Sequence, residues 1–131
     1  MATDTAGTTA RVTEHQVVHF IRKDITYSNA GQTVTVGVLP AGALIVKAMS
    51  GVHVSTAFSG GSAYTLDVGY STDSGTNNLA TALTLAAVGF VVLDETVTDM
   101  YLTADRTIQA LVTSDGTAGV AQIVIAYIPN L

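Results

Sequence analysis

The segment that decides the fold is residues 119–128, which read GVAQIVIAYI. In an extended strand, alternate side chains point to opposite faces. One face would carry Ala121, Ile123, Ile125 and Tyr127, and the other would carry Val120, Gln122, Val124, Ala126 and Ile128. A strand that is apolar on both faces is buried on both. Because a two-layer sandwich leaves one face of each sheet to solvent, we expect another protein surface, most simply a second copy of the chain, to cover the second face.

The same period of two recurs along most of the chain and predicts a series of short strands. Residues 32–39 alternate most clearly, and we expect Val34, Val36 and Val38 to point inward. The remaining predicted strands cover residues 15–23, 43–58 (with a bulge or bend at Gly51), 63–71, 90–93, 97–103, 107–113 and 119–128.

Residues 79–88 fit two patterns. Leu79, Leu83 and Ala86 recur at helical spacing, although Leu79, Leu83 and Leu85 also fit an alternating strand. We expect a short helix here, leading into the strand at residues 90–93.

Short strands at regular spacing, separated by turns rich in Gly, Asn, Asp and Ser, are typical of β-sandwiches and jelly rolls. No substantial helix separates the strands, which disfavours a parallel α/β sheet. The fold class that the sequence predicts is all-β: a single-domain antiparallel β-sandwich, jelly-roll-like, over residues 13–131. Residues 1–12 are small and polar, and we expect them to form a flexible N-terminal arm.

The composition is poor in charge for a chain of 131 residues, which is the size of one domain. Hydrophobic residues make up 48 % and charged residues only 11 %, against roughly 25 % charged residues in an average soluble domain. Two explanations remain open: another protein covers part of the surface, or a surface rich in Thr, Ser and Gly is solvated without charge.

Charge and hydropathy exclude two classes of partner. The net charge is −5 and the only basic pair is Arg22-Lys23, so direct nucleic-acid binding is not expected. The longest purely apolar stretch, residues 85–93, is too short to span a membrane as a helix and contains Gly89. Residues 1–10 lack the basic and apolar regions of a signal peptide, so we expect synthesis in a cytoplasm.

No set of residues predicts an enzyme, a metal site or a cofactor. There is no cysteine, and His15 and His19 would lie roughly 13 Å apart on one strand, too far to share a metal ion. The polar run 73–78 lacks the alternating acids of a calcium loop. The candidate acid/base carboxylates, Asp94, Glu95, Asp99 and Asp105, lie in or beside predicted turns and are expected to be solvated.

A carbohydrate-binding module would need exposed aromatic side chains. The chain has no Trp, and Tyr64, Tyr70, Tyr101 and Tyr127 lie within predicted strands. Only Tyr27, beside a turn, is expected to be free.

Four segments resemble a known family: residues 36–45 (VGVLPAGALI), 64–70 (YTLDVGY), 107–112 (TIQALV) and 121–127 (AQIVIAY). Together they are similar to small virion proteins of tailed bacteriophages, and most similar to the capsid decoration, or cement, proteins. The resemblance spans about residues 32–128 and carries no catalytic or ligand motif.

The resemblance implies a small β-sandwich or jelly roll on the outside of the head shell, made in the bacterial host cytoplasm. Its partners would be the major capsid protein and further copies of itself, with a homotrimer favoured and a dimer possible. It would clamp neighbouring capsid subunits together.

The predicted oligomer or capsid interface consists of Val120, Gln122, Val124, Ala126 and Ile128, with Arg11 and Val12 in the arm. The alternatives are another virion part (a head fibre, tail or baseplate domain) and a receptor- or carbohydrate-binding β-sandwich.

Overall fold

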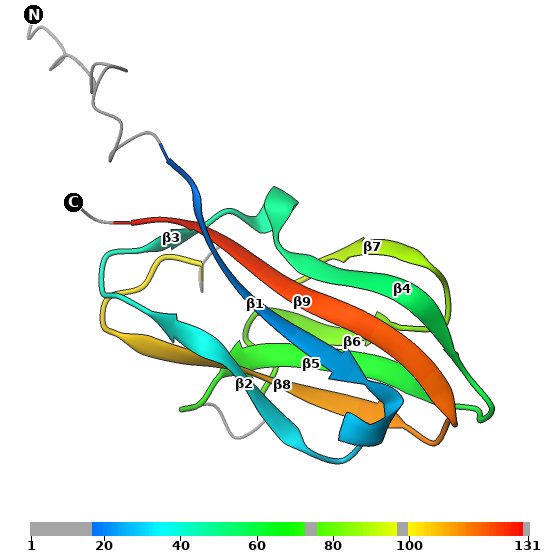
Figure 1. The fold of residues 1–131 in the computed structure, drawn as a ribbon. Helices are drawn as coiled ribbons and strands as arrows, with labels where there is room; N and C mark the ends of the chain where they lie inside the picture. Colours follow the sequence, from blue (N-terminus) through cyan, green and yellow to red (C-terminus); the bar gives the residue numbers. More distant parts are fainter. Residues whose placement is uncertain (1–16, 73–75, 97–99, 130–131) are drawn as a thin grey trace, which may run out of the picture.

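Two antiparallel β-sheets pack face to face in the computed structural model, which describes residues 17–72, 76–96 and 100–129 (Figure 1). Sheet A consists of β1 (His19–Thr26), β9 (Ala118–Ile128), β4 (Gly51–Ser59) and β7 (Gly89–Val92) in that order, and β3 (Leu44–Ile45) adds to the end of β9. Sheet B consists of β2 (Thr33–Leu39), β8 (Arg106–Ser114), β5 (Tyr64–Tyr70) and β6 (Ala80–Thr84) in that order.

The strand pairing is that of a jelly roll. The first strand pairs with the last, and successively inner strands pair with one another: β1 with β9, β2 with β8, β4 with β7 and β5 with β6. The chain therefore folds as one long antiparallel hairpin that is wrapped into two sheets. The prediction of an all-β, jelly-roll-like sandwich is confirmed.

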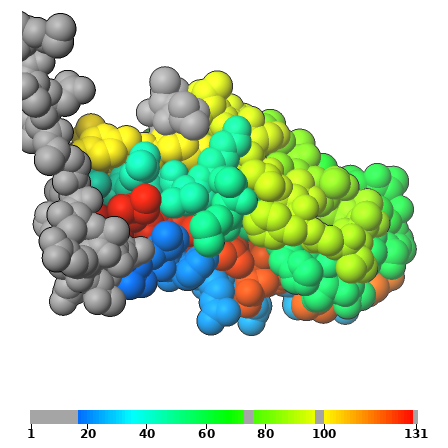
Figure 2. Space-filling view, turned by 90° about the horizontal axis from the view of Figure 1, so that it is seen from above, coloured from blue at the N-terminus to red at the C-terminus, as the bar shows by residue number. Residues whose placement is uncertain are grey.

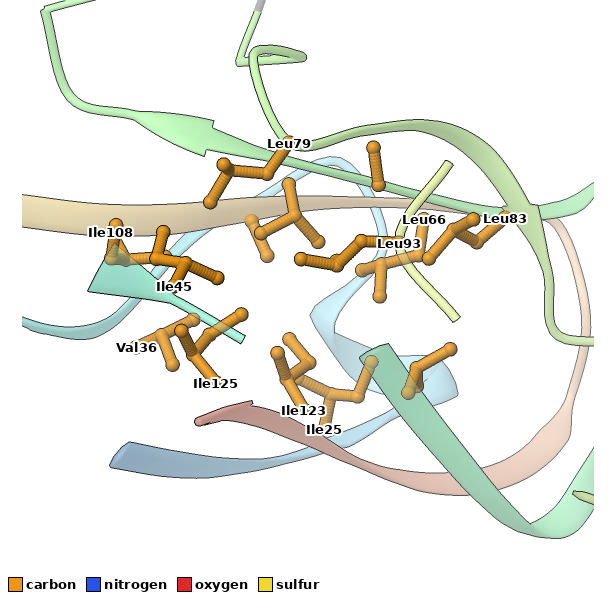
Figure 3. Close-up of a cluster of buried hydrophobic side chains, with 14 of the residues drawn as sticks. Ile25, Val36, Ile45, Leu66, Leu79, Leu83, Leu93, Ile108, Ile123 and Ile125 are labelled. Atoms are coloured by element: carbon orange, nitrogen blue, oxygen red, sulfur yellow. The ribbon is translucent and has the colours of Figure 1, made fainter. Parts of the chain in front are cut away.

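The core lies between the two sheets and is built from one face of each strand. Figure 3 shows these side chains pointing toward one another, from sheet A, from sheet B and from the connecting segments. The largest fully buried side chains are Phe58, Ile25, Leu39, Leu66, Leu79, Leu85, Leu93, Met100, Leu102, Ile108, Ile123 and Ile125. Complete burial of each such side chain is worth about 1.5–3 kcal/mol, so the core is the main source of stability.

The predicted strand over residues 43–58 is interrupted near Gly51, as the sequence indicated. The short strand β3 is followed by a 3-10 turn, η2 (Lys47–Met49), before β4 begins at Gly51. A Cβ at Gly51 would collide with the carbonyl oxygen of Val91. Glycine at this position therefore lets β7 approach β4 closely.

The helix expected within residues 79–88 is absent, and that prediction was wrong. The segment forms β6, with a bulge: Leu83 is opposite Leu66, but Ala80 is opposite Val68. The extra residue on β6 places buried side chains three positions apart, which is the spacing of a helix. Ala82 has a φ of 54° within this bulge, and its N–H donates to a carboxylate oxygen of Asp67.

A second bulge reverses the direction of Val38. The register of β2 against β8 shifts between Thr35 and Gly37, so the inward positions are Val34, Val36 and Leu39. Val38 is 59 % exposed on the outer face of sheet B, which corrects the prediction that it points inward.

Other predicted boundaries also need correction. The first strand begins at His19 and extends to Thr26, later than predicted. No strand is described within residues 100–103, where Tyr101 makes only an isolated bridge to Leu44, and residues 97–99 lie outside the described ranges. The predicted arm (1–12), with Arg11 and Val12, also lies outside the described residues.

The described residues include a second 3-10 turn, η1 (Tyr27–Asn29), but no helix with the length and apolar character needed to cross a membrane.

Candidate interface on the outer face of sheet A

The outer face of sheet A, which points away from the core, carries several exposed large apolar side chains. Four strands contribute side chains to it. The side chains are Phe20, Arg22 and Asp24 from β1; Val120, Gln122, Val124 and Ile128 from β9; His53 from β4; and Phe90 and Val92 from β7. Leu44 on β3 lies opposite Ile128 and extends this face.

The strand register arranges these side chains in rows across the sheet. One row runs Asp24, Gln122, His53, Phe90, and the next runs Arg22, Val124, Gly51, Val92. Directly opposite residues of an antiparallel pair project on the same face, so each row is a set of neighbours. The Gln122 side-chain amide donates to a carboxylate oxygen of Asp24 at 2.8 Å, which joins β9 to β1 across the face.

Large apolar side chains on this face are open to solvent. Phe20 is 50 % exposed, Phe90 45 %, Val120 42 %, Ile128 41 % and Val92 40 %. Phe90 and Val92 are neighbours on one face of β7, whereas Val120 and Ile128 lie at opposite ends of β9. Several exposed apolar side chains on one face of a sheet mark it as a candidate interaction surface.

A shallow depression lies at the β1–β9 side of this face. Its volume is about 440 Å³, and it is lined by Phe20, Arg22, Gln122 and Val124. No described residue forms an ion pair with Arg22, so its guanidinium group is available to an acidic partner. The depression combines an apolar wall with one free positive charge.

All five interface residues predicted on β9 project on this face, but only four of them are accessible. Val120 and Ile128 are exposed and Gln122 and Val124 are half-buried. Ala126 is fully buried, because Ser50 covers it: the Ala126 N–H donates to the Ser50 hydroxyl oxygen at 2.9 Å. Ala126 therefore offers no surface to a partner.

The sequence-based interface lacked the contributions of β1 and β7. The alternation of residues 18–23 puts Phe20 on one face of its strand, but nothing in the sequence shows that β1 pairs with β9. The same holds for Phe90 and Val92, which reach this face only because β7 pairs with β4.

The outer face of sheet B is different in chemistry. Its outward positions on the four strands carry mostly hydroxyl side chains: Thr33, Thr35, Thr65, Thr84, Thr107 and Thr113. The hydroxyl-rich explanation of the low charge therefore fits the outer face of sheet B, and cover by another protein stays a prediction for sheet A. Sheet B is solvated by hydroxyl groups, and sheet A presents apolar side chains.

The carboxylates proposed from the sequence as acid/base candidates have structural roles in turns. Asp94 accepts a hydrogen bond from the Thr81 N–H at 2.9 Å, and Glu95 accepts one from the Thr81 hydroxyl at 2.8 Å. Asp105 accepts one from the Ala41 N–H at 2.8 Å. Asp99 lies outside the described residues.

Asp115 holds two turns together. One of its oxygens accepts from the N–H groups of Ser62 and Ala63, at 2.7 and 2.8 Å, and the other accepts from the Ser62 hydroxyl. The N–H groups of Ala63 and Ser62 lower the pKa of Asp115 from its ordinary value of 3.8, with a further contribution from the Ser62 hydroxyl. The described residues contain no group of three His, Cys, Asp or Glu side chains that could hold a metal ion.

The tyrosines do not form a sugar-binding platform within the described ranges. Tyr70 is buried with Arg106 over its ring, and Tyr64 is half-buried. Tyr27 and Tyr101 are exposed, but Tyr27 follows the end of β1 that pairs with Val120, whereas Tyr101 contacts the β3 end of sheet A. The length of β9 separates them, roughly 25 Å at 3.3 Å per residue.

Comparison with known proteins gives matches in structure but not in sequence. No protein-family model matches the chain, and no curated protein matches its sequence. A chain of the acidic stable capsid structure of Helicobacter pylori bacteriophage KHP30 superimposes with a TM-score of 0.68 and 19 % identity, covering 86 % of this chain and 88 % of that chain. A chain of the cyanophage Pam1 capsid asymmetric unit gives a TM-score of 0.61 and 15 % identity, covering 99 % and 93 %.

At such low identity the likeness establishes the fold: this jelly roll is one that chains of two phage capsid structures also have. The resemblance to phage virion proteins that the sequence indicated is thereby confirmed at the level of the fold.

Proposed function

We propose that this chain is a capsid decoration protein, which binds the outer surface of a bacteriophage head and stabilises the contacts between major capsid subunits. The observation that carries the proposal is the open apolar outer face of sheet A, on a fold shared with phage capsid chains. The protein would be made in the host cytoplasm and would function on the virion surface.

The extent of the structural matches supports a role as a whole capsid component. Each match covers most of both chains, so the two capsid chains are about as long as this one. A lone jelly roll of this size is therefore found as a complete chain in both capsid structures. That favours the head over a tail, fibre or baseplate domain.

The outer face of sheet A has the physical properties of a surface that docks on another protein. Covering about 300 Å² of apolar surface would contribute about 7 kcal/mol, before the entropic cost of association is subtracted. The unpaired Arg22 adds a contact for an acidic side chain of the shell and would fix the orientation of the bound protein.

Binding to heads tests the proposal directly. Purified protein is incubated with heads that lack it and the bound fraction is measured by co-sedimentation, for the wild type and for Phe20→Asp. Phe20 is half-exposed at the edge of sheet A, so the variant is expected to fold normally and to bind at least about tenfold more weakly, because a carboxylate then has to be desolvated in the contact.

The matched control is Val38→Asp, which places the same charge at an exposed apolar position on an edge strand of sheet B. This variant is expected to bind as the wild type does. The proposal is wrong if the wild type does not bind heads, and the assignment of the face is wrong if the two variants bind equally well.

A further inference from the structure

The edge strand β7 is open and carries no charge. It is the edge strand of sheet A opposite β1, and residues 86–93 around it read AAVGFVVL, without one polar side chain. Val88 is 66 % exposed, and Phe90 and Val92 are also exposed. Figure 2 looks onto this edge and shows the yellow-green residues of β7 uncovered at the surface.

The backbone of β7 has hydrogen-bonding groups that point away from the sheet. The Leu93 N–H donates to the backbone carbonyl oxygen of Ser50, on the β4 side, at 3.1 Å. Because these groups alternate along a strand, the N–H and C=O groups of Val91 also point toward β4, and those of Phe90 and Val92 point outward. No described residue pairs with these outward groups.

The other three sheet edges are protected against strand addition. The β1 edge carries the charged run 22–24. The β2 edge is bulged between Thr35 and Gly37 and lies against Ile21 of β1. The β6 edge is also bulged, and its Thr81 N–H is capped by a carboxylate oxygen of Asp94. Charges, bulges and covering are the devices by which proteins prevent edge-to-edge association, and β7 has none of them.

We propose that β7 is a dimerisation strand, which pairs antiparallel with β7 of a second copy about a two-fold axis at Val91. In this register Phe90 lies opposite the partner's Val92, and Val92 lies opposite the partner's Phe90. Both are residues whose N–H and C=O groups point outward, so each pair exchanges two backbone hydrogen bonds.

Two features favour a second copy of this chain as the partner that pairs with β7. The pairing is self-complementary, since the two-fold axis brings an aromatic and a β-branched side chain opposite each other twice on the same face, a favourable cross-strand pair. The uncharged edge also permits two identical strands to approach without like-charge repulsion.

The dimer joins two copies of sheet A into one continuous sheet. Its outer face is then continuous across the axis, with Phe90 and Val92 of both copies at the centre. Antiparallel pairing of a single edge strand closes at two copies, so this contact makes a dimer and not the trimer that the sequence resemblance favoured.

Sedimentation equilibrium of the full chain tests the proposal, with Val92→Lys as the variant and Val38→Lys as the matched control on sheet B. The wild type and Val38→Lys are expected to be dimers. Val92→Lys is expected to raise the dimer dissociation constant at least about tenfold, because two like charges would meet near the axis.

Amide hydrogen exchange of the wild type supplies a second measurement that needs no variant. The amides of Phe90 and Val92 are expected to be protected in the dimer and to exchange faster on dilution, while the Val91 amide, bonded to β4, stays protected at both concentrations. A wild type that is a monomer or a trimer, a Val92→Lys chain that dimerises unchanged, or Phe90 and Val92 amides that exchange freely at every concentration would each overturn the proposal.

Discussion

Asp115 shows how one exposed carboxylate organises two turns of this fold. Its oxygens accept the N–H groups of Ser62 and Ala63 and the Ser62 hydroxyl, so residues 59–63 and 114–117 are fixed to each other. Glycines permit this close approach, since a Cβ at Gly61 would collide with the Asp115 carboxylate and one at Gly60 with Thr117. The sequence predicts that both segments are turns, but it does not predict that they contact each other.

The lowered pKa of Asp115 predicts a pH dependence of stability. A carboxyl whose pKa is lower in the folded chain stabilises that chain above the unfolded pKa, 3.8, and this contribution disappears as the pH falls through the folded pKa. We expect Asp115→Asn to be less stable than the wild type at neutral pH, with the difference shrinking below pH 3.8. Urea unfolding of both proteins across this range measures it, and a difference that stays constant with pH would contradict the assignment.

At the scale of single elements, which side chains point inward was predictable in strands with uniform alternation but not throughout the bulged strands. β2, β5, β8 and β9 all lie within one residue of their predicted bounds, and in the last three the inward side chains also recur at every second position. In β2 and β6 a bulge shifts the period, and a bulge is defined by pairing with another strand, which a local pattern does not contain. The inward prediction for Val38 and the helix at residues 79–88 failed for this one reason.

Leu85 distinguishes the strand from the helix that the sequence favoured. A helix that buries Leu79, Leu83 and Ala86 would turn Leu85 away from the core. In the structure Leu85 is fully buried and Ala86 is exposed. We therefore expect Leu85→Ala to lower the free energy of unfolding by about 2–5 kcal/mol, whereas Ala86→Ser changes it by less than about 0.5 kcal/mol. Chemical denaturation measures both, and equal effects would contradict the strand register.

At the scale of the whole molecule, the two outer faces divide the surface between solvent and partner. The candidate interface could be predicted only for β9, because its residues are contiguous in sequence and its second face is visibly apolar. The contributions of Phe20, Arg22, Phe90 and Val92 depend on the order β1-β9-β4-β7, which follows from the jelly-roll topology.

The N-terminal residues contribute a separate prediction at this scale. We propose that residues 1–12, with Arg11 and Val12, form an arm that contacts the shell and lies outside the folded domain. Deleting residues 1–12 is expected to weaken head binding and to leave the thermal unfolding midpoint unchanged, because small polar side chains have little apolar surface to bury in a core. Calorimetry and co-sedimentation of the truncated chain measure the two effects. A large fall in the midpoint would show instead that the segment belongs to the domain.

The most direct test of the central claim is a cryo-electron microscopy reconstruction of phage heads incubated with the purified protein. The account predicts added jelly-roll density on the outside of the shell, with the outer face of sheet A against the major capsid protein. Heads without added density, or density in which the hydroxyl-rich outer face of sheet B makes the contact and sheet A faces solvent, would contradict it.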